Sequence, residues 1–330
     1  MNRRQFLSGG GLAAAAAISS AGCLARPSSP DKEYFVNWAR GILNISWPLS
    51  GEDLRLRVIG DTHFTYFDSR DKEYADNYAR LSGFGKNLPE EHLPGEAGQE
   101  FFEQAISTAA KDNIDAIILV GDILSFPSIA NVEYAKKSLD ACGVPWMYIA
   151  GNHDWHFEGL EGSSDALRKT WVAKRLSPLY PEGANPMMYS KVVKGVRIVA
   201  IDNSTYLISR EQVDFWKAEA SKGDPIILAM HIPLYVEACG SQYYCGSPKW
   251  GAATDGIWEI ERRPRWAEKA TDETFEFRDA VLSTPNLVGV FTGHIHHAIS
   301  MRGNGQNMFS VADCRAKRRH LDVTVQKATR

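Results

Sequence analysis

Five apolar segments of the chain share one feature, which is a polar residue one or two positions after the segment ends. The first segment alternates apolar and polar positions, as a half-buried strand does. The second is dominated by apolar, β-branched residues, which is typical of a strand covered on both faces. The five predicted strands span residues 54–59, 114–120, 146–150, 226–230 and 287–292. They close on Gly60-Asp61, Gly121-Asp122, Gly151-Asn152, His231 and Gly293-His294.

Apolar residues recur at helical spacing between these strands. The predicted helices cover residues 101–109, 132–142, 165–176, 210–221 and 272–282. Further strands are predicted at 188–193 and 196–201, as a hairpin around Lys194-Gly195, and at 308–312 and 321–325. This alternation predicts an α/β fold with layered sheets, formed by a single domain over residues 31–330. Polar and aromatic stretches with Gly and Pro predict loop insertions at about 65–98 and 235–270.

The polar residues after the five strands predict a ligand site, because ligands of open α/β sheets collect outside the carboxyl ends of the strands. The set mixes carboxylate and amide oxygens with imidazoles, which suits Zn, Mn or Fe and contains no thiolate. One ion cannot use so many side chains, whereas two ions that share a bridging carboxylate can. The candidates in chain order are Asp61, His63, Asp122, Asn152, His153, Asp154, His231, His294 and His296.

Five short motifs in this order resemble the signature of the calcineurin-like metallophosphoesterase family over about residues 55–297. They are GDTH at 60–63, GD at 121–122, GNHD at 151–154, the lone His231 before Pro233, and GHIH at 293–296. The resemblance implies a two-sheet β-sandwich flanked by helices, with two divalent or mixed-valence ions. It implies that these ions generate a bridging hydroxide that attacks the phosphate ester.

The resemblance also implies a role for each motif residue. One ion would be held by Asp61, His63 and His296. The other ion would be held by Asn152, His231 and His294, and Asp122 would bridge the two. His153 would donate a proton to the leaving oxygen, with Asp154 orienting its ring.

Backbone direction separates the three histidines of the GHIHH segment. Because side chains two positions apart in an extended chain point the same way, His294 and His296 are expected on one side and His297 on the other. We expect His297 to play a supporting or structural part. After the strand 196–201, the pair Asp202-Asn203 is expected to form a turn, with a supporting role at the site as the alternative.

Departures from the family pattern bear on the substrate. Ser125 stands where purple acid phosphatases carry a tyrosine, so no purple colour is expected. Trp155 stands where protein phosphatases carry an arginine after Gly-Asn-His-Asp, which argues against protein substrates. Another guanidinium could still reach the site from a loop, and the candidates are Arg70, Arg80 and Arg262.

The first thirty residues predict an export signal and a linker. Arg3-Arg4 and Gln5-Phe6-Leu7, followed by an Ala-rich apolar stretch, resemble the twin-arginine signal that is read by the twin-arginine export machinery. Ala21-Gly22-Cys23 resembles a lipoprotein box, so Cys23 is a candidate lipid anchor, with plain cleavage near Ala21 as the alternative. A periplasmic or other extracytoplasmic location follows, where Cys239 and Cys245 could form a disulfide.

Charge and composition narrow the function further. Lys and Arg number 37 against 40 Asp and Glu, a net charge of −3, whereas nucleic-acid-binding proteins usually carry a basic surplus. We therefore expect a small organic phosphate ester as the substrate and no nucleic acid. The leading prediction is an exported two-metal phosphoesterase whose choice between diesters and monoesters is open, with a slight lean to diesters. A phosphate-scavenging phosphomonoesterase and a catalytically silent metal-binding envelope protein are the alternatives.

Overall fold

Two six-stranded mixed sheets form the centre of the molecule in the computed structural model, which describes residues 33–75, 77, 97–236, 270–311 and 319–327. In the first sheet, β3, β4 and β5 run parallel, and β12 lies antiparallel to β3 and parallel to β2. Its strands in spatial order are β1 (Tyr34–Asn37), β2 (Ile42–Trp47), β12 (Leu321–Lys327), β3 (Leu54–Ile59), β4 (Ala116–Leu119) and β5 (Trp146–Tyr148).

The second sheet has a parallel centre, formed by β11, β9, β8 and β7, and an antiparallel strand at each edge. Its strands in spatial order are β10 (Ile299–Gly303), β11 (Gln306–Ser310), β9 (Leu287–Thr292), β8 (Ile226–Ala229), β7 (Val196–Ile201) and β6 (Met188–Val193).

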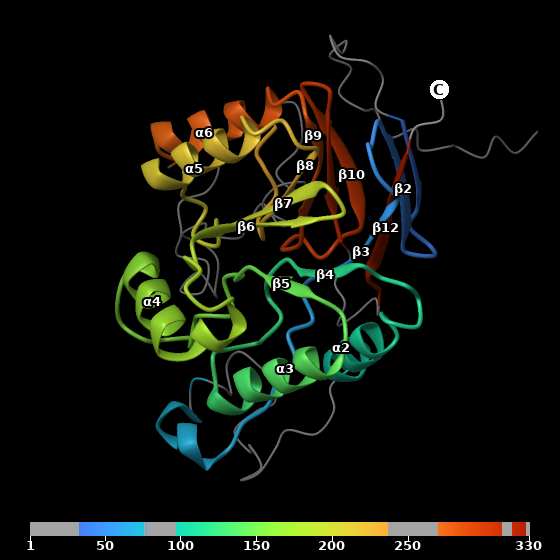
Figure 1. Cartoon of the computed structure of the whole chain (residues 1–330). Helices are drawn as coiled ribbons and strands as arrows, with labels where there is room; N and C mark the ends of the chain where they lie inside the picture. Colours follow the sequence, from blue (N-terminus) through green and yellow to red (C-terminus); the bar gives the residue numbers. More distant parts are fainter. Residues whose placement is uncertain (1–32, 76, 78–96, 237–269, 312–318, 328–330) are drawn as a thin grey trace, which may run out of the picture.

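Helices cover the outer faces of the two sheets, which gives four layers (Figure 1). The first sheet is covered by α2 (Ala97–Ser107) and α3 (Ile129–Ala141), and the second by α5 (Arg210–Ala220) and α6 (Asp272–Leu282). A shorter helix, α4 (Ser164–Trp171), continues into a π-helical turn, η2 (Val172–Leu176), and a 3-10 turn, η3 (Ser177–Leu179). Four of these helices begin after a Ser or Thr whose side chain accepts a backbone N–H, as N-caps do; the caps are Ser128, Ser163, Ser209 and Thr271.

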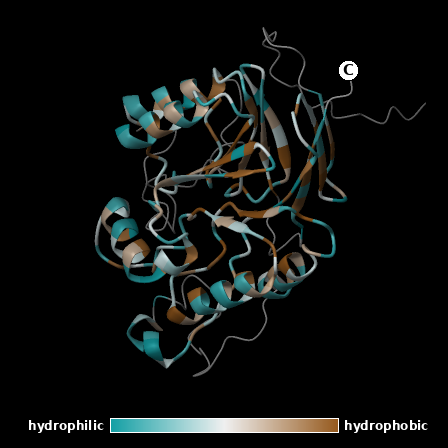
Figure 2. Cartoon of the chain, in the orientation of Figure 1, coloured by the Kyte–Doolittle hydropathy of each residue, from teal (hydrophilic) through white to brown (hydrophobic). Residues whose placement is uncertain are grey.

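The apolar core lies in two layers, and β7 shows why. Ile198 and Ala200 face the first sheet, whereas Val199 and Ile201 face α5 and α6, because successive strand residues point to opposite faces. Figure 2 shows hydrophobic residues concentrated in the central strands and hydrophilic residues along much of the flanking helices. A parallel strand between two covered faces must be apolar throughout, which explains the lack of alternation in β4, β8 and β9.

The predicted α/β fold of two layered sheets with flanking helices is confirmed. The sequence pattern did not reveal β1, β2 and β10, nor the 3-10 helix η1 (Ser69–Tyr74) inside the stretch expected to be a long loop. Within the described ranges, no helix is both long and apolar enough to cross a membrane. The export segment 1–30, Cys23, and the Cys239–Cys245 pair lie outside the described residues.

Candidate metal centre

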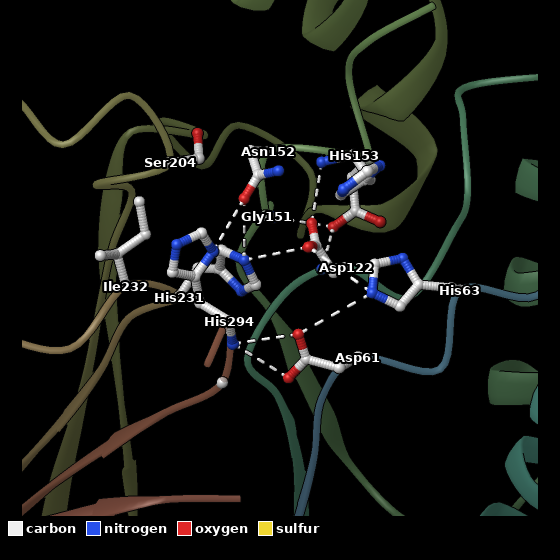
Figure 3. Close-up of polar contacts among 12 residues, drawn as sticks. Asp61, His63, Asp122, Gly151, Asn152, His153, Ser204, His231, Ile232 and His294 are labelled. Carbon is white, nitrogen blue, oxygen red and sulfur yellow. Dashed lines mark hydrogen bonds and ion pairs between the residues drawn. The ribbon is translucent and has the colours of Figure 1, made fainter. Parts of the chain in front are cut away.

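Seven candidate ligands come together where five strands end, at one edge of the two facing sheets. All of them except His296 are labelled in Figure 3. They form two groups on either side of Asp122. We call Asp61, His63 and His296 the open cluster, because the His296 side chain is 36% exposed. We call Asn152, His231 and His294 the buried cluster, because each of these residues is at most 2% exposed.

The buried cluster is arranged around the side-chain oxygen of Asn152. Asn152 Oδ1 lies 3.2 Å from His231 Nε2 and 3.1 Å from His294 Nδ1. The same His231 nitrogen lies 3.2 Å from Asp122 Oδ2. In Figure 3 the rings of His231 and His294 lie together beneath Asn152 and face the Asp122 carboxylate. Four donor atoms thus converge in the protein interior.

The open cluster places two imidazole nitrogens face to face. His63 Nε2 and His296 Nε2 are 3.2 Å apart, and His296 Nε2 is 3.4 Å from Asp61 Oδ1. Ligands that share one tetrahedral or octahedral ion at about 2.1 Å are about 3.0–3.4 Å from each other. The spacing in the buried cluster, and the two distances from His296 in the open cluster, therefore fit side chains that converge on a common ion. Asp61 Oδ1 and His63 Nε2 lie farther apart, at 3.9 Å.

Asp122 stands between the clusters, as a bridging ligand must. Its Oδ2 lies 3.2 Å from His231 Nε2 on one side and 3.8 Å from His63 Nε2 on the other. Its Oδ1 accepts a hydrogen bond of 2.8 Å from the backbone N–H of His153. That bond fixes the carboxylate plane and leaves Oδ2 directed toward both clusters.

The charges of the side chains at the site favour an ionised Asp122 beside a protonated histidine. Burial would raise the pKa of Asp122, but the charges of His231 and His153 outweigh burial and hold it well below its ordinary value. Burial would lower the pKa of His231, but Asp122 and then Asp61 raise it to about 9. The pocket is thus built for positive charge, which a bound cation would provide in place of the proton.

The loop backbone differs from the extended chain assumed for the site. Five of the seven residues have positive φ angles, namely Asp61 (54°), His63 (44°), Asp122 (52°), His294 (70°) and His296 (56°). Such a conformation costs on the order of 1–3 kcal/mol for each non-glycine residue and persists where the surroundings enforce it. His294 and His296 consequently turn toward different clusters instead of sharing one side. His297 is exposed, and its supporting or structural part stays a prediction.

Glycines before the ligands allow the strand-end loops to approach each other closely. A Cβ on Gly151 would collide with the carboxylate of Asp122, and a Cβ on Gly293 would collide with that of Asp61. The Asp61 carboxylate also accepts the backbone N–H of His294 with both oxygens, at 3.0 Å each. The Gly residues in the motifs are therefore required by packing between loops.

The Asp154 carboxylate holds the backbone of two strand-end loops. Its carboxylate accepts three backbone N–H groups, from Asp122 (2.9 Å), Leu124 (2.7 Å) and Gly151 (2.8 Å). Burial, and then repulsion by Asp122, raise the pKa of Asp154 to about 7. Asp154 thus ties the loop after β4 to the loop after β5, and its expected role in orienting the His153 ring stays a prediction.

The structure shows the positions of some, but not all, of the other residues that the sequence analysis singled out. The ring of His153 lies 4.9 Å from that of His63, measured between centroids, on the open side of the centre. Trp155 is buried and donates its Nε1–H to Ser204 Oγ at 2.8 Å. Arg70 pairs with Asp68 and Glu133 on the surface, so its guanidinium is engaged elsewhere. Arg80 and Arg262 lie outside the described residues.

A model of one protein family, described as calcineurin-like phosphoesterase, matches residues 54–298, which includes every strand-end loop of the centre. The chain belongs to the calcineurin-like phosphoesterase family. It is a metal-dependent phosphoric ester hydrolase. The clustered Asp and His side chains indicate that its cofactors are divalent metal ions. The earlier expectation from the five motifs is thereby confirmed at the level of the family and the enzyme class.

Similar proteins include a probable cyclic nucleotide phosphodiesterase of Psychrobacter sp. (strain PRwf-1), which is 22% identical over 220 residues. That match covers 63% of this chain and 55% of the relative, so the chain spans about half of the relative's length. Purple acid phosphatase PPD1 of yellow lupin (Lupinus luteus) has the same fold, with a TM-score of 0.51 and 14% identity, over 82% of this chain and 46% of that chain. A dimetal phosphatase of Danio rerio aligns with a TM-score of 0.46 and 11% identity, over 78% and 86% of the two chains.

Proposed function

We propose that this phosphoesterase hydrolyses small organic phosphodiesters with two metal ions, one held by each cluster and both by Asp122. The observation that carries the proposal is the position of the Asp122 Oδ2 atom, within 3.8 Å of an imidazole nitrogen from either cluster. Two ions bound in this way would supply Lewis-acid activation of a water molecule and of the phosphoryl oxygens. Their identity, among Mn, Fe and Zn, depends on supply as well as on the ligands.

Side chains of this chain supply the remaining chemistry. His153 lies beside His63 on the open side, where a substrate can approach, and we assign it the proton that the leaving oxygen requires. Its backbone is held by the bond to Asp122 Oδ1, so the proton donor and the bridging carboxylate move as one unit. Asp154 acts on this pair indirectly, since it fixes the N–H groups of Asp122 and Gly151.

A diester is favoured by the charge at the site. A phosphodiester carries one negative charge near neutral pH, whereas a monoester carries about 1.5 to 2. Among the described residues, no arginine or lysine pairs with Asp61 or Asp122, and Trp155 takes the place of the arginine that follows Gly-Asn-His-Asp in protein phosphatases. Within the described part of the chain, the two carboxylates of the centre thus have no arginine or lysine beside them that could meet a second phosphate charge. The Psychrobacter relative is named for cyclic nucleotides, which makes a cyclic diester one substrate to test.

The test compares hydrolysis of bis(4-nitrophenyl) phosphate, 3′,5′-cyclic AMP and 4-nitrophenyl phosphate by the purified full-length chain with added Mn²⁺. Asp122→Asn is expected to lower kcat/KM by about a hundredfold or more, because it removes the bridging charge. Asp140→Asn is the matched control, since it makes the same chemical change on the exposed side of α3.

Each outcome selects one function. Turnover of the diesters above the monoester, lost in Asp122→Asn, supports the proposal. A higher kcat/KM for the monoester would instead favour the phosphomonoesterase. Stoichiometric Mn²⁺ binding without turnover of any ester would favour the silent metal-binding protein.

Export is proposed from the N-terminal segment alone. We propose that the twin-arginine machinery carries the phosphoesterase out of the cytoplasm, and that Cys23 then anchors it through a lipid. Replacing Arg3 and Arg4 with lysine is expected to retain the protein in the cytoplasmic fraction. Cys23→Ser is expected to move it from the membrane fraction to the soluble periplasm, and an unchanged distribution in both variants would contradict the two proposals.

A further inference from the structure

The loop that joins β7 to α5 provides none of the candidate ligands, yet it contacts both histidines of the buried cluster. Tyr206 Oη lies 2.7 Å from His294 Nε2. Asn203 Oδ1 accepts the backbone N–H of His231 at 3.2 Å and that of Ile232 at 3.0 Å, and Asn203 Nδ2 donates to the carbonyl of Ile232 at 2.7 Å. The turn expected at this place is therefore also a support for the centre.

We propose that the loop 202–206 positions the buried cluster for its ion, and that the Tyr206 hydroxyl fixes the ring of His294. This inference rests on the proposed function, because it assumes that the buried cluster binds a metal ion. Tyr206 is a positioning residue here, since it touches a ligand and neither the ion nor the substrate.

The two nitrogens of each imidazole show how the support operates. His294 Nδ1 faces the cluster, 3.1 Å from Asn152 Oδ1, and can bind an ion only with a free electron pair. His294 Nε2 must then carry the proton, and it donates that proton to Tyr206 Oη. His231 has the opposite arrangement, with Nε2 toward the cluster and Nδ1–H donating to the backbone carbonyl of Val120 at 2.8 Å. The partner of the second nitrogen fixes both the tautomer and the ring orientation.

Tyr206 is itself held in one place. It is 3% exposed, its φ is 66°, and its N–H donates to the carbonyl of Asn203 at 2.7 Å. The first residue of the loop, Asp202, accepts Ser204 N–H (2.8 Å) and Ser204 Oγ–H (2.6 Å) with one carboxylate oxygen. Gln212 of α5 donates to the Asp202 carbonyl at 2.7 Å. A buried loop with so many internal bonds can enforce a tyrosine backbone conformation that is otherwise unfavourable.

The open cluster is supported differently, which provides a control. Ser125 Oγ donates to the backbone carbonyl of His63 at 2.6 Å and accepts from Thr65 Oγ1 at 2.9 Å. This contact holds the backbone and does not involve a ring nitrogen. Ser125→Ala and Tyr206→Phe each remove one buried hydroxyl beside one cluster, so the pair forms a matched comparison.

The experiment measures Mn²⁺ binding to the metal-free full-length protein by calorimetry and by electron paramagnetic resonance, without reference to turnover. Tyr206→Phe is expected to weaken one of the two ions by about 10–100-fold and to leave the other nearly unchanged, because only His294 loses its partner. Ser125→Ala is expected to spare the ion that Tyr206→Phe weakens. Equal weakening of both ions by Tyr206→Phe, or no weakening, would overturn the inference.

A spectroscopic measurement distinguishes a loss of His294 ring positioning from a general loss of protein stability. In Zn²⁺-loaded protein with ¹⁵N-labelled histidine, the Nε2–H signal that disappears in His294→Asn is expected to be protected from solvent exchange. It should lose this protection in Tyr206→Phe, and an unchanged signal would contradict the inference. Where Tyr206→Phe is too unstable to purify, Asn203→Asp tests the same loop, since a carboxylate would repel the Ile232 carbonyl and weaken the same ion.

The failure of this inference is distinguishable from failure of the proposed function. If the wild-type protein binds two ions and hydrolyses diesters while Tyr206→Phe binds both ions as the wild type does, only the positioning role is wrong. If the wild-type protein binds fewer than two ions, the two-metal function on which the inference rests is wrong.

Discussion

The open and the buried cluster hold similar side chains in different surroundings. Both combine two histidines with an oxygen ligand, and both reach Asp122. His296 is 36% exposed in its side chain, whereas His231 is fully buried. The ring partners of His231 and His294 are interior groups, the Val120 carbonyl and the Tyr206 hydroxyl. Under the proposed two-metal function, one ion would belong to the protein interior and the other to the surface where substrate arrives.

The largest expected effect is on the free energy of unfolding, and it differs between substitutions in the two clusters. His231→Ala leaves the buried Asp122 carboxylate without its main cationic partner, and it should lower the free energy of unfolding of the metal-free protein by about 3–5 kcal/mol. His296→Ala acts at a partly exposed position and should cost less than about 1 kcal/mol. Urea unfolding of both variants measures the difference, and equal losses would mean that the two clusters are not distinct.

The pH dependence of metal binding should follow the buried cluster. The pKa of His231 is about 9 in the metal-free protein, because Asp122 and Asp61 outweigh the effect of burial. Below pH 9 an ion must displace this proton, so its affinity should fall by about tenfold for each pH unit below 9 and level off above it. Mn²⁺ titrations from pH 7 to pH 10 test this. In His231→Asn the dependence should disappear, and persistence of the same slope would assign the proton elsewhere.

Chelation should remove the two ions at different rates. The ion of the open cluster can leave beside the exposed His296, whereas the ion of the buried cluster requires a local opening of the loops. Adding EDTA to the Mn²⁺-loaded protein should therefore give two kinetic phases of equal amplitude. Tyr206→Phe should accelerate only the slower phase, and a single phase in the wild type would contradict the distinction.

The smallest expected effect concerns an ion pair outside both clusters, which serves as a reference for the pH dependence of stability. Arg57 of β3 is buried and bonds Asp322 of β12 at 2.7 and 2.8 Å. Burial alone would raise the pKa of Asp322, but the bonds from Arg57 and then His320 lower it to about 2. Because the pKa of Asp322 is lower in the folded state than its value near 3.8 in the unfolded state, the ionised carboxylate stabilises the fold above pH 3.8. This stabilisation is lost as the pH falls toward 2. About 1 kcal/mol should be lost between pH 7 and pH 3.

Unfolding at these two pH values, with and without Mn²⁺, measures that loss. Asp322→Asn should remove this part of the acid sensitivity and leave metal affinity unchanged. A change in Mn²⁺ affinity in Asp322→Asn would show that the strand pairing of β12 influences the metal centre.

The sequence by itself determined the elements whose signal is local. Strands β6, β7 and β9 and helix α6 follow the predicted ranges, because alternation and helical spacing are properties of neighbouring residues. The motif residues after the strands also came from local pattern, and the parallel arrangement of those strands explains why they meet. The short edge strands β1 and β10 carry a weak local signal and are formed by pairing with β2 and β11.

Only the tertiary structure decided how the loops present the ligands. The positive φ angles of Asp61, His63 and His294 are enforced by contacts with other loops, and no local pattern predicts them. The task of Asp154 and the support from Tyr206 likewise depend on groups 30 or more positions away in the chain. Hydrogen bonds between distant segments exist only after the sheets have formed. Residue types and their order therefore specified the chemistry of the centre, and the fold specified its geometry.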